Sequence, residues 1–218
     1  RTSGGLVPPF LLELETVMAS VVDICNLALA RLGDDATVAS IDPPEGSPQA
    51  EQCARFYPVA RDALLEAHPW QFAVRRVRLA RLSLPTWNWR HVYAAPNNAL
   101  QLLGVLPEAA ASDDETESFE TESDDSGAIL IRTDQASATL RYTARVTDAS
   151  RFSPLFVDAL AWLLASHLAG PLIKGTEGAK MAQQCYANFR TVFSQAVVSN
   201  ANQRHVEPGH VPDWMGAR

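Results

Sequence analysis

Residue types that support acid–base chemistry meet in one short stretch, RDALLEAHPWQFA (residues 61–73). It contains Glu66 and His68, and a histidine beside a carboxylate is a common pair in general acid–base catalysis. The same stretch is also typical of a structural corner. An apolar helical run stops at the His-Pro pair, because proline disfavours a helical conformation of the preceding residue. We therefore expect a corner at which Trp70 and Phe72 fix the next segment against the core.

Other side chains that could carry chemistry are scattered along the chain. Asp62 and Glu66 lie four residues apart and share a helical face, but Arg55 and Arg61 are near enough in sequence to pair with them. No GxSxG motif is present, and GTEG lacks the lysine and the spacing of a phosphate-binding loop. The histidines, which show neither HxH nor HExxH spacing, are His68, His91, His167, His205 and His210. We expect no catalytic residue, no metal site and no cofactor.

The cysteines and the apolar runs also argue for a plain folded core. Cys25, Cys53 and Cys185 lie far apart, and each sits in a helical apolar pattern, so we expect reduced thiols in the core. No CxxC or Cys/His spacing indicates zinc. The apolar runs fall short of the roughly 20 residues that span a bilayer, and we expect no membrane segment.

Composition indicates a globular chain with one unusual segment. The chain has 218 residues, 47% of them hydrophobic and 20% charged, and a net charge of -7. Nine acidic residues and no basic residue lie between positions 108 and 125, so the remainder is near neutral. Such a segment buries too little apolar surface to offset its ordering entropy. We expect a mobile tip, with a short strand around Phe119.

A second stretch, between residues 68 and 107, has five arginines and no acidic residue, with aromatic residues among them. Three interpretations stay open: a stacking and phosphate-binding surface for single-stranded nucleic acid, a protein interface rich in arginine and tryptophan, or arginines that face the acidic segment of the same chain. We predict a subunit interface or channel surface, formed by Arg75, Arg76, Arg78, Arg81, Trp87 and Trp89.

Start and stop signals divide the chain into four helices with strands between them. Ser20 and Asp23 form a predicted capping box, Gly33 ends the first helix, and Ser-Pro pairs at 47–48 and 153–154 start two more. We expect Gly170-Pro171 to end the third helix and Thr176 to cap the fourth. The strands AILIRT and SATLRYTARV are close enough for a hairpin, with Leu140 and Tyr142 on one face.

These elements predict an α+β fold. We expect a four-helix bundle from two N-terminal and two C-terminal helices, in residues 18–69 and 148–198, with a β-rich insertion at 70–147 that carries an acidic loop at 108–126. Residues 1–17 are interpreted as added during cloning or translated from upstream, since Met18 resembles a native start. Residues 199–218 are predicted to form an extended tail.

The predicted tail contains one tryptophan among prolines and glycine. An extended segment with a single aromatic anchor suits docking on another chain, although a disordered terminus has the same composition. The residues predicted to contact a partner protein or a neighbouring subunit are Trp214, Val211, His210 and His205.

Between residues 20 and 197 the chain resembles the head-to-tail adaptor family of short-tailed phages, also called tail tubular protein A. The blocks that carry the resemblance are VDICNLALARLGD, AEQCARFYPVARDALLEAHPWQFA, WRHVYAAPNNALQLLGV, AILIRT and ATLRYTARVTDASRFSPLFVDALAWLLASHLA, in this order. The resemblance implies a helical bundle with a β insertion and offers no active site. It also implies a homo-oligomeric ring of about twelve copies below the portal, which extends the DNA channel and presents a surface to the tail nozzle.

The resemblance thus leads us to expect a structural virion protein. It would lie in the neck of the virion, and in the host cytoplasm during assembly, with genomic DNA passing through without sequence-specific contact. The expected partners are the portal protein above and a tail nozzle or tail tube protein below. A head-completion or stopper protein, a virion-associated cell-wall-degrading enzyme and a single-stranded nucleic-acid-binding protein are the alternatives.

Overall fold

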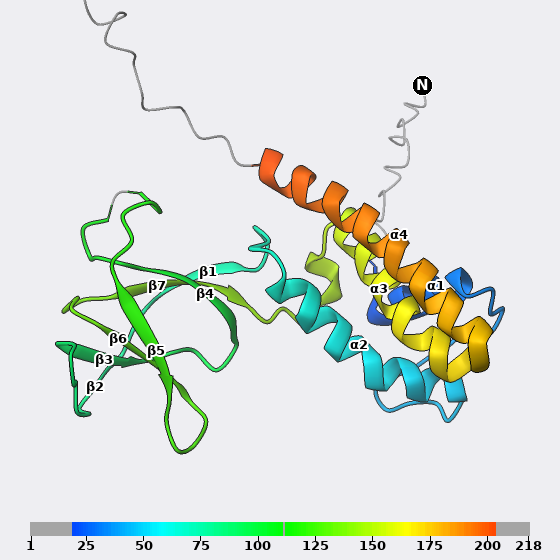
Figure 1. Cartoon of the computed structure of the whole chain (residues 1–218), viewed down its shortest axis with the longest axis horizontal. Coiled ribbons are helices and arrows are strands. Elements are labelled where there is room, and N and C mark those ends of the chain that lie inside the picture. Colours follow the sequence, from blue (N-terminus) through cyan, green and yellow to red (C-terminus); the bar gives the residue numbers. More distant parts are fainter. Residues whose placement is uncertain (1–18, 111, 204–218) are drawn as a thin grey trace, which may run out of the picture.

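The computed structural model describes residues 19–110 and 112–203. In these residues the chain forms an α+β fold with two regions, one helical and one of strands (Figure 1). The helices are α1 (Val21–Arg31), α2 (Pro48–Glu66), α3 (Pro154–Ile173) and α4 (Gly175–Asn202), with a 3-10 turn at Ala149–Arg151. The strands are β1 (Val74–Arg78), β2 (Arg81–Leu82), β3 (His91–Ala94), β4 (Ala99–Leu106), β5 (Phe119–Ser123), β6 (Ile129–Thr133) and β7 (Thr139–Ala144).

The predicted helix starts are confirmed where a side chain caps them. The Ser20 hydroxyl accepts from the Asp23 amide at 3.1 Å, and the Asp23 carboxylate accepts from the Ser20 amide at 2.9 Å. Ser47 and Ser153 cap α2 and α3 with the hydroxyl alone, which accepts from the amide three residues on, and each is followed by proline at the first helical position. Gly33, with φ of 73°, turns the chain after α1.

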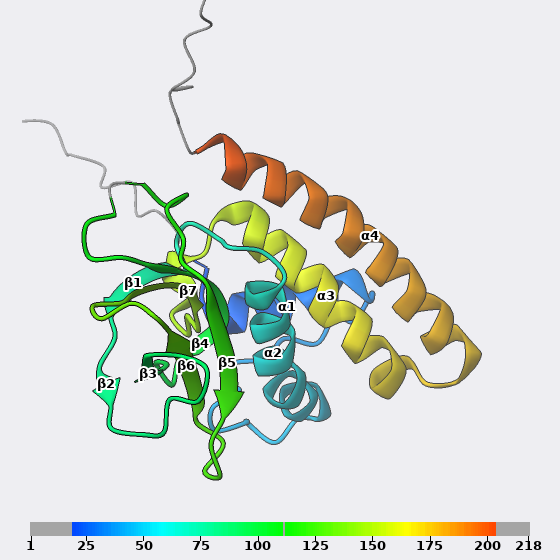
Figure 2. The same cartoon turned by 60° about the vertical axis from the view of Figure 1, so that its left-hand side comes forward.

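The predicted four-helix bundle is wrong. Helix α3 packs against α1, α2 and α4, and α3 lies between α2 and α4 in both views (Figures 1 and 2). The reason is that α3 is apolar around its whole circumference, so it acts as a central rod that the other helices cover from different sides. A four-helix bundle instead needs four amphipathic helices that share one core.

The ends of α3 and α4 also differ from the prediction. Helix α3 continues past Gly170 to Ile173, and the chain turns at Lys174 and Gly175, which have φ of 61° and 60°. Lys174 is the N-cap of α4 and makes no side-chain cap, so Thr176 does not cap this helix.

The expectation that no apolar run is long enough to span a bilayer needs correction as well. By length and composition α3 is able to cross a membrane, and half of its most apolar window is buried inside the protein. A central core helix has the same composition, so this property alone is weak support for a membrane segment.

The strands form two antiparallel sheets, ordered β1-β7-β4 and β2-β3-β6-β5. The predicted hairpin of AILIRT and SATLRYTARV is wrong: β6 pairs with β3 and β5, whereas β7 pairs with β1 and β4. A short polar connection shows that the chain turns, but it does not show which strands pair. A second core forms between the sheets around Tyr93, Val105, Ile131 and Leu140.

The corner at residues 68–72 joins the two regions, and it is structural, as predicted. Trp70 is 1% exposed, and its indole donates to the Leu64 carbonyl at 2.8 Å. Its ring meets the ring of Phe156 edge-on, with centroids 5.0 Å apart. His68 packs edge-on against Trp70 and lies 3.0 Å from the Asn200 amide.

Candidate functional site

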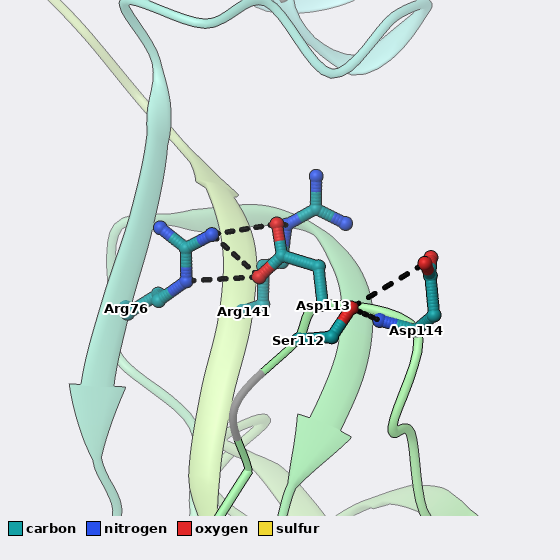
Figure 3. Close-up of polar contacts among 5 residues, drawn as sticks. All are labelled: Arg76, Ser112, Asp113, Asp114 and Arg141. Carbon is teal, nitrogen blue, oxygen red and sulfur yellow. Dashed lines mark hydrogen bonds and ion pairs between the residues drawn. The ribbon is translucent and has the colours of Figure 1, made fainter. Parts of the chain in front are cut away.

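Two arginines and one aspartate form the most organised charged group on the β region (Figure 3). Arg76 on β1 and Arg141 on β7 lie directly opposite each other in the strand register. Like charges in directly opposed positions of an antiparallel pair are destabilising. Asp113, from the acidic segment, supplies the opposite charge and binds between them. We call these three residues the Arg76–Arg141 site.

The contacts in the Arg76–Arg141 site are unequal. The Arg76 guanidinium donates three hydrogen bonds to Asp113. Nη2 lies 2.5 Å from Oδ1 and 2.6 Å from Oδ2, and Nε lies 3.1 Å from Oδ1. The Arg141 Nε is 3.4 Å from Asp113 Oδ2, an ion pair without hydrogen-bond geometry. Side-chain exposure is 52% for Arg76, 23% for Arg141 and 18% for Asp113. Asp113 therefore satisfies Arg76 better than it satisfies Arg141.

A cleft of about 610 Å³ opens beside the Arg76–Arg141 site. Its walls come from the corner after α2, from β1 and β7, and from the last turn of α4. The polar residues that line it, besides the three of the site, are His68, Gln71, Asn200 and Gln203. Gln71 is bonded to Asn200 by its amide at 3.1 Å and its side chain at 3.0 Å, which ties the two walls together.

The acidic segment has further contacts with the same surface. Arg78 reaches Glu108 at 3.1 Å, with both side chains about two thirds exposed. The Glu117 amide donates to the Val105 carbonyl at 2.8 Å. Strand β5 confirms the predicted strand around Phe119. The third interpretation of the arginine-rich stretch, in which its arginines face the acidic segment, holds for Arg76 and Arg78.

A second surface lies on the loop from residue 83 to residue 90, which we call the tryptophan loop. Trp87 at its tip is 78% exposed and has φ of 50°, a conformation that bulky residues rarely adopt. Three hydrogen bonds to residues outside the loop hold it in place. The Arg132 guanidinium donates to the Pro85 carbonyl, the Arg90 amide donates to Asp134, and the Trp89 indole donates to Glu120. Arg132 is itself fixed by Glu122 at 2.5 Å.

The predicted site residues thus fall into separate places. Arg75 is half-buried and donates to the carbonyls of Phe72 and Val74, while Arg81 is exposed on β2. Arg76 and Arg78 meet the acidic segment, whereas Trp87 and Trp89 lie on the tryptophan loop. The predicted tail residues Trp214, Val211, His210 and His205 lie outside the described residues.

Sequence reasoning missed Arg141, Asp113 and Arg132. The alternation that places Leu140 and Tyr142 on one face of β7 also places Arg141 on the other. Its position opposite Arg76 depends on strand register, however, which the sequence pattern does not give.

Asp62, His68 and His167, three of the residues that could support acid–base chemistry, contact other side chains of the fold. Asp62 pairs with Arg61 and Arg145, each at 2.8 Å. Burial lowers the pKa of both His68 and His167, which favours their neutral forms. His167 stacks on Phe56 with centroids 6.0 Å apart. Among the described residues, no three His, Cys, Asp or Glu side chains are grouped so that they could hold a metal ion.

The three cysteines are buried and free, as predicted. A hydrogen bond with Cys53 and burial both raise the pKa of the Cys25 thiol. Burial raises the pKa of Cys185 as well. A thiol whose pKa is raised is a poor nucleophile at neutral pH.

Comparison with known proteins found no family model that matches this chain and no curated protein similar to it.

Proposed function

We propose that the protein is a structural subunit of the head-to-tail adaptor kind, which assembles with its own copies into a ring in the neck of a short-tailed phage. The ring would connect portal and tail and enclose the path of the DNA. The resemblance of residues 20–197 to that family motivates the proposal. The observation that carries it is the exposed Trp87 on its braced loop.

Trp87 has the properties of a protein-contact residue. A left-handed backbone at a bulky residue costs on the order of 1–3 kcal/mol and persists only where the surroundings enforce it. Here Arg132, Asp134 and Glu120 enforce it, yet the indole is not packed into the core. Tryptophan is among the residues that contribute most to protein interfaces when a partner buries it.

A closed ring needs a second, different surface on each copy, because neighbours meet head to tail. The outer side of α4 provides a candidate. Val198 and Tyr186, at different points around this helix, are 59% and 50% exposed. Near the end of the helix a shallow depression is lined by Ser194, Gln195, Val198, Ser199 and Asn202. We propose that the tryptophan loop of one copy contacts this side of α4 in the next.

The pairing of the arginines bears on the nucleic-acid alternative. Arg76 and Arg78 are engaged by carboxylates of the same chain, and the adjacent acidic segment repels a phosphate backbone. A single-stranded nucleic-acid binder would show affinity for an oligonucleotide that falls steeply with salt. We expect no such binding at physiological ionic strength.

Native mass measurement over a concentration series, with negative-stain images of the same samples, tests the proposal. We expect rings of about a dozen copies around an open channel, the number that the family resemblance implies. A compact dimer without a channel, or a monomer at every concentration, would contradict a self-assembling ring.

A further inference from the structure

The Arg76–Arg141 site has the properties of a ligand site that the chain fills with its own side chain. Two guanidinium groups are fixed next to each other by the β1–β7 register, and a carboxylate binds between them. We infer that Arg76 and Arg141 form a binding site for a carboxylate of a partner protein. When no partner is bound, the Asp113 carboxylate of the same chain occupies this site.

The two halves of this contact differ in how firmly the fold holds them. Arg76 and Arg141 stand on paired strands, and β7 lies in the middle of its sheet. Asp113 stands in a connection whose neighbouring residues, Ser112, Asp114 and Glu115, are all exposed. The arginines therefore keep their places if the connection moves away.

The other attachments of this connection are mainly polar. The Arg78–Glu108 pair is about two thirds exposed on both sides, and exposed pairs of this kind contribute little. A backbone bridge joins Glu117 to Val105, and the Ser118 carbonyl accepts a hydrogen bond from the Thr133 hydroxyl at 2.9 Å. No buried apolar side chain lies between positions 112 and 118. Residues 112–118 therefore add nothing to the apolar core, and β1 and β7 keep their own strand pairing when Asp113 leaves the site.

Space for an external ligand exists next to the site. The cleft of about 610 Å³ reaches the two arginines from the side of His68 and Asn200. Asp113 leaves the Nε of Arg141 without a hydrogen bond. A carboxylate on a longer side chain, such as glutamate, could enter from the cleft and reach both guanidinium groups. Amide and imidazole groups in the walls could bond the peptide around it.

The chemistry favours a protein carboxylate over a nucleic-acid phosphate. The guanidinium fork binds a carboxylate through two parallel hydrogen bonds, which is how Arg76 already holds Asp113. The nine acidic residues of positions 108–125 repel anions of both classes, so the choice between them rests on the fit of the guanidinium fork to a planar carboxylate.

Tethering makes Asp113 a strong competitor. A group on a short flexible connection acts at an effective concentration on the order of millimolar, so an external carboxylate binds weakly to the unmodified protein. Replacing Asp113 removes the competitor and leaves both arginines. The affinity for an acidic peptide is then expected to rise about tenfold or more.

Fluorescence anisotropy with a labelled hexaglutamate peptide, at low ionic strength, tests the inference on the full chain. The variants are Asp113→Asn and, as a matched control, Asp114→Asn. Asp114 is the adjacent residue, carries the same charge and bonds only to Ser112 among the contacts drawn in Figure 3. We expect Asp113→Asn to bind the peptide about tenfold more tightly than the wild type and Asp114→Asn.

Two further comparisons test whether the arginines bind the peptide and which class of ligand the site prefers. Adding Arg141→Gln to Asp113→Asn should return the affinity to that of the wild type. If Asp113→Asn and Asp114→Asn raise the affinity for the peptide equally, the effect is one of general charge, and the proposed site is wrong. If Asp113→Asn raises the affinity for a single-stranded oligonucleotide as much as the affinity for the peptide, the assignment to a protein carboxylate is wrong. None of these outcomes depends on ring formation.

Discussion

At the scale of single residues, Trp70 and Trp87 show the two uses that this chain makes of tryptophan. Trp70 is buried at the corner between helices and strands, where its indole donates to Leu64 and its ring contacts Phe156. Trp87 is exposed on a loop that other side chains hold in place. Sequence alone predicted the first role, because the His-Pro pair marks the end of the helix. It could not separate the two tryptophans by exposure, which depends on how strands far apart in sequence meet.

Replacing these two tryptophans should have very different effects on stability. We expect Trp70→Ala to lower the free energy of unfolding by about 3–5 kcal/mol, because it empties a large buried site. Trp87→Ala serves as the control and, at a protein concentration below that at which rings form, should change it by less than about 0.5 kcal/mol. Urea unfolding followed by circular dichroism measures both. Similar losses in the two variants would contradict the burial of Trp70.

Tyr57 gives a pH-dependent prediction. Burial raises its pKa to about 12, and among the described residues its hydroxyl has no hydrogen-bond partner. Between about pH 10 and pH 12 the unfolded chain loses the phenol proton while the folded chain keeps it. The unfolded state then binds fewer protons, so stability falls as pH rises through this range.

Tyr57→Phe should remove that contribution. We expect a shallower alkaline loss of stability than in the wild type, and little change at neutral pH because no hydrogen bond is lost. Urea unfolding at about pH 8 and about pH 11 provides the measurement. Tyr186→Phe, which alters a half-exposed phenol, is the control. Parallel pH dependence in the wild type and Tyr57→Phe would refute the assignment.

At the scale of elements, local sequence signals predicted where helices start, but not which helices pack together or which strands pair. The caps at Ser20, Ser47 and Ser153 depend on side chains within three residues of the bond they make, so the sequence contains all that is needed. The four-helix bundle was wrong because α3 is apolar on every side and gives no preferred face. The hairpin prediction failed because β6 and β7 find their partners in different sheets.

Substitution of Gly104 tests whether the acidic segment depends on the close contact between Thr116 and strand β4. A Cβ atom at this position would lie 2.8 Å from the Thr116 methyl carbon, so glycine permits a close approach. We expect Gly104→Ala to displace Thr116 and to speed hydrogen exchange at the Glu117 amide, which bonds to Val105. Global stability should change by less than about 1 kcal/mol, because Thr116 is exposed.

Adding Thr116→Ser to Gly104→Ala provides the control, since serine lacks the methyl group that the new Cβ would meet. Hydrogen exchange at Glu117 should then return toward its rate in the wild type. Unchanged exchange in Gly104→Ala would show that the segment does not depend on this contact.

At the scale of the whole molecule, the resemblance of the sequence blocks predicts a ring subunit, and two separate surfaces are compatible with head-to-tail assembly. One is the tryptophan loop at one end of the β region, and the other is the outer side of α4. The sequence could indicate the aromatic and apolar residues on these surfaces. It could not indicate their separation, which follows from the packing of strands and helices.

The ring mass of matched variants is the most direct test of the central claim that the tryptophan loop joins subunits. Native mass spectra at equal protein concentration should be compared for the wild type, Trp87→Ala and Val59→Ala. Val59 is also an exposed apolar residue, and it stands on α2, which belongs to neither proposed surface. The account predicts rings for the wild type and Val59→Ala, and contacts weakened by about 2 kcal/mol or more, with few rings, for Trp87→Ala. Equal ring fractions in all three proteins would contradict it.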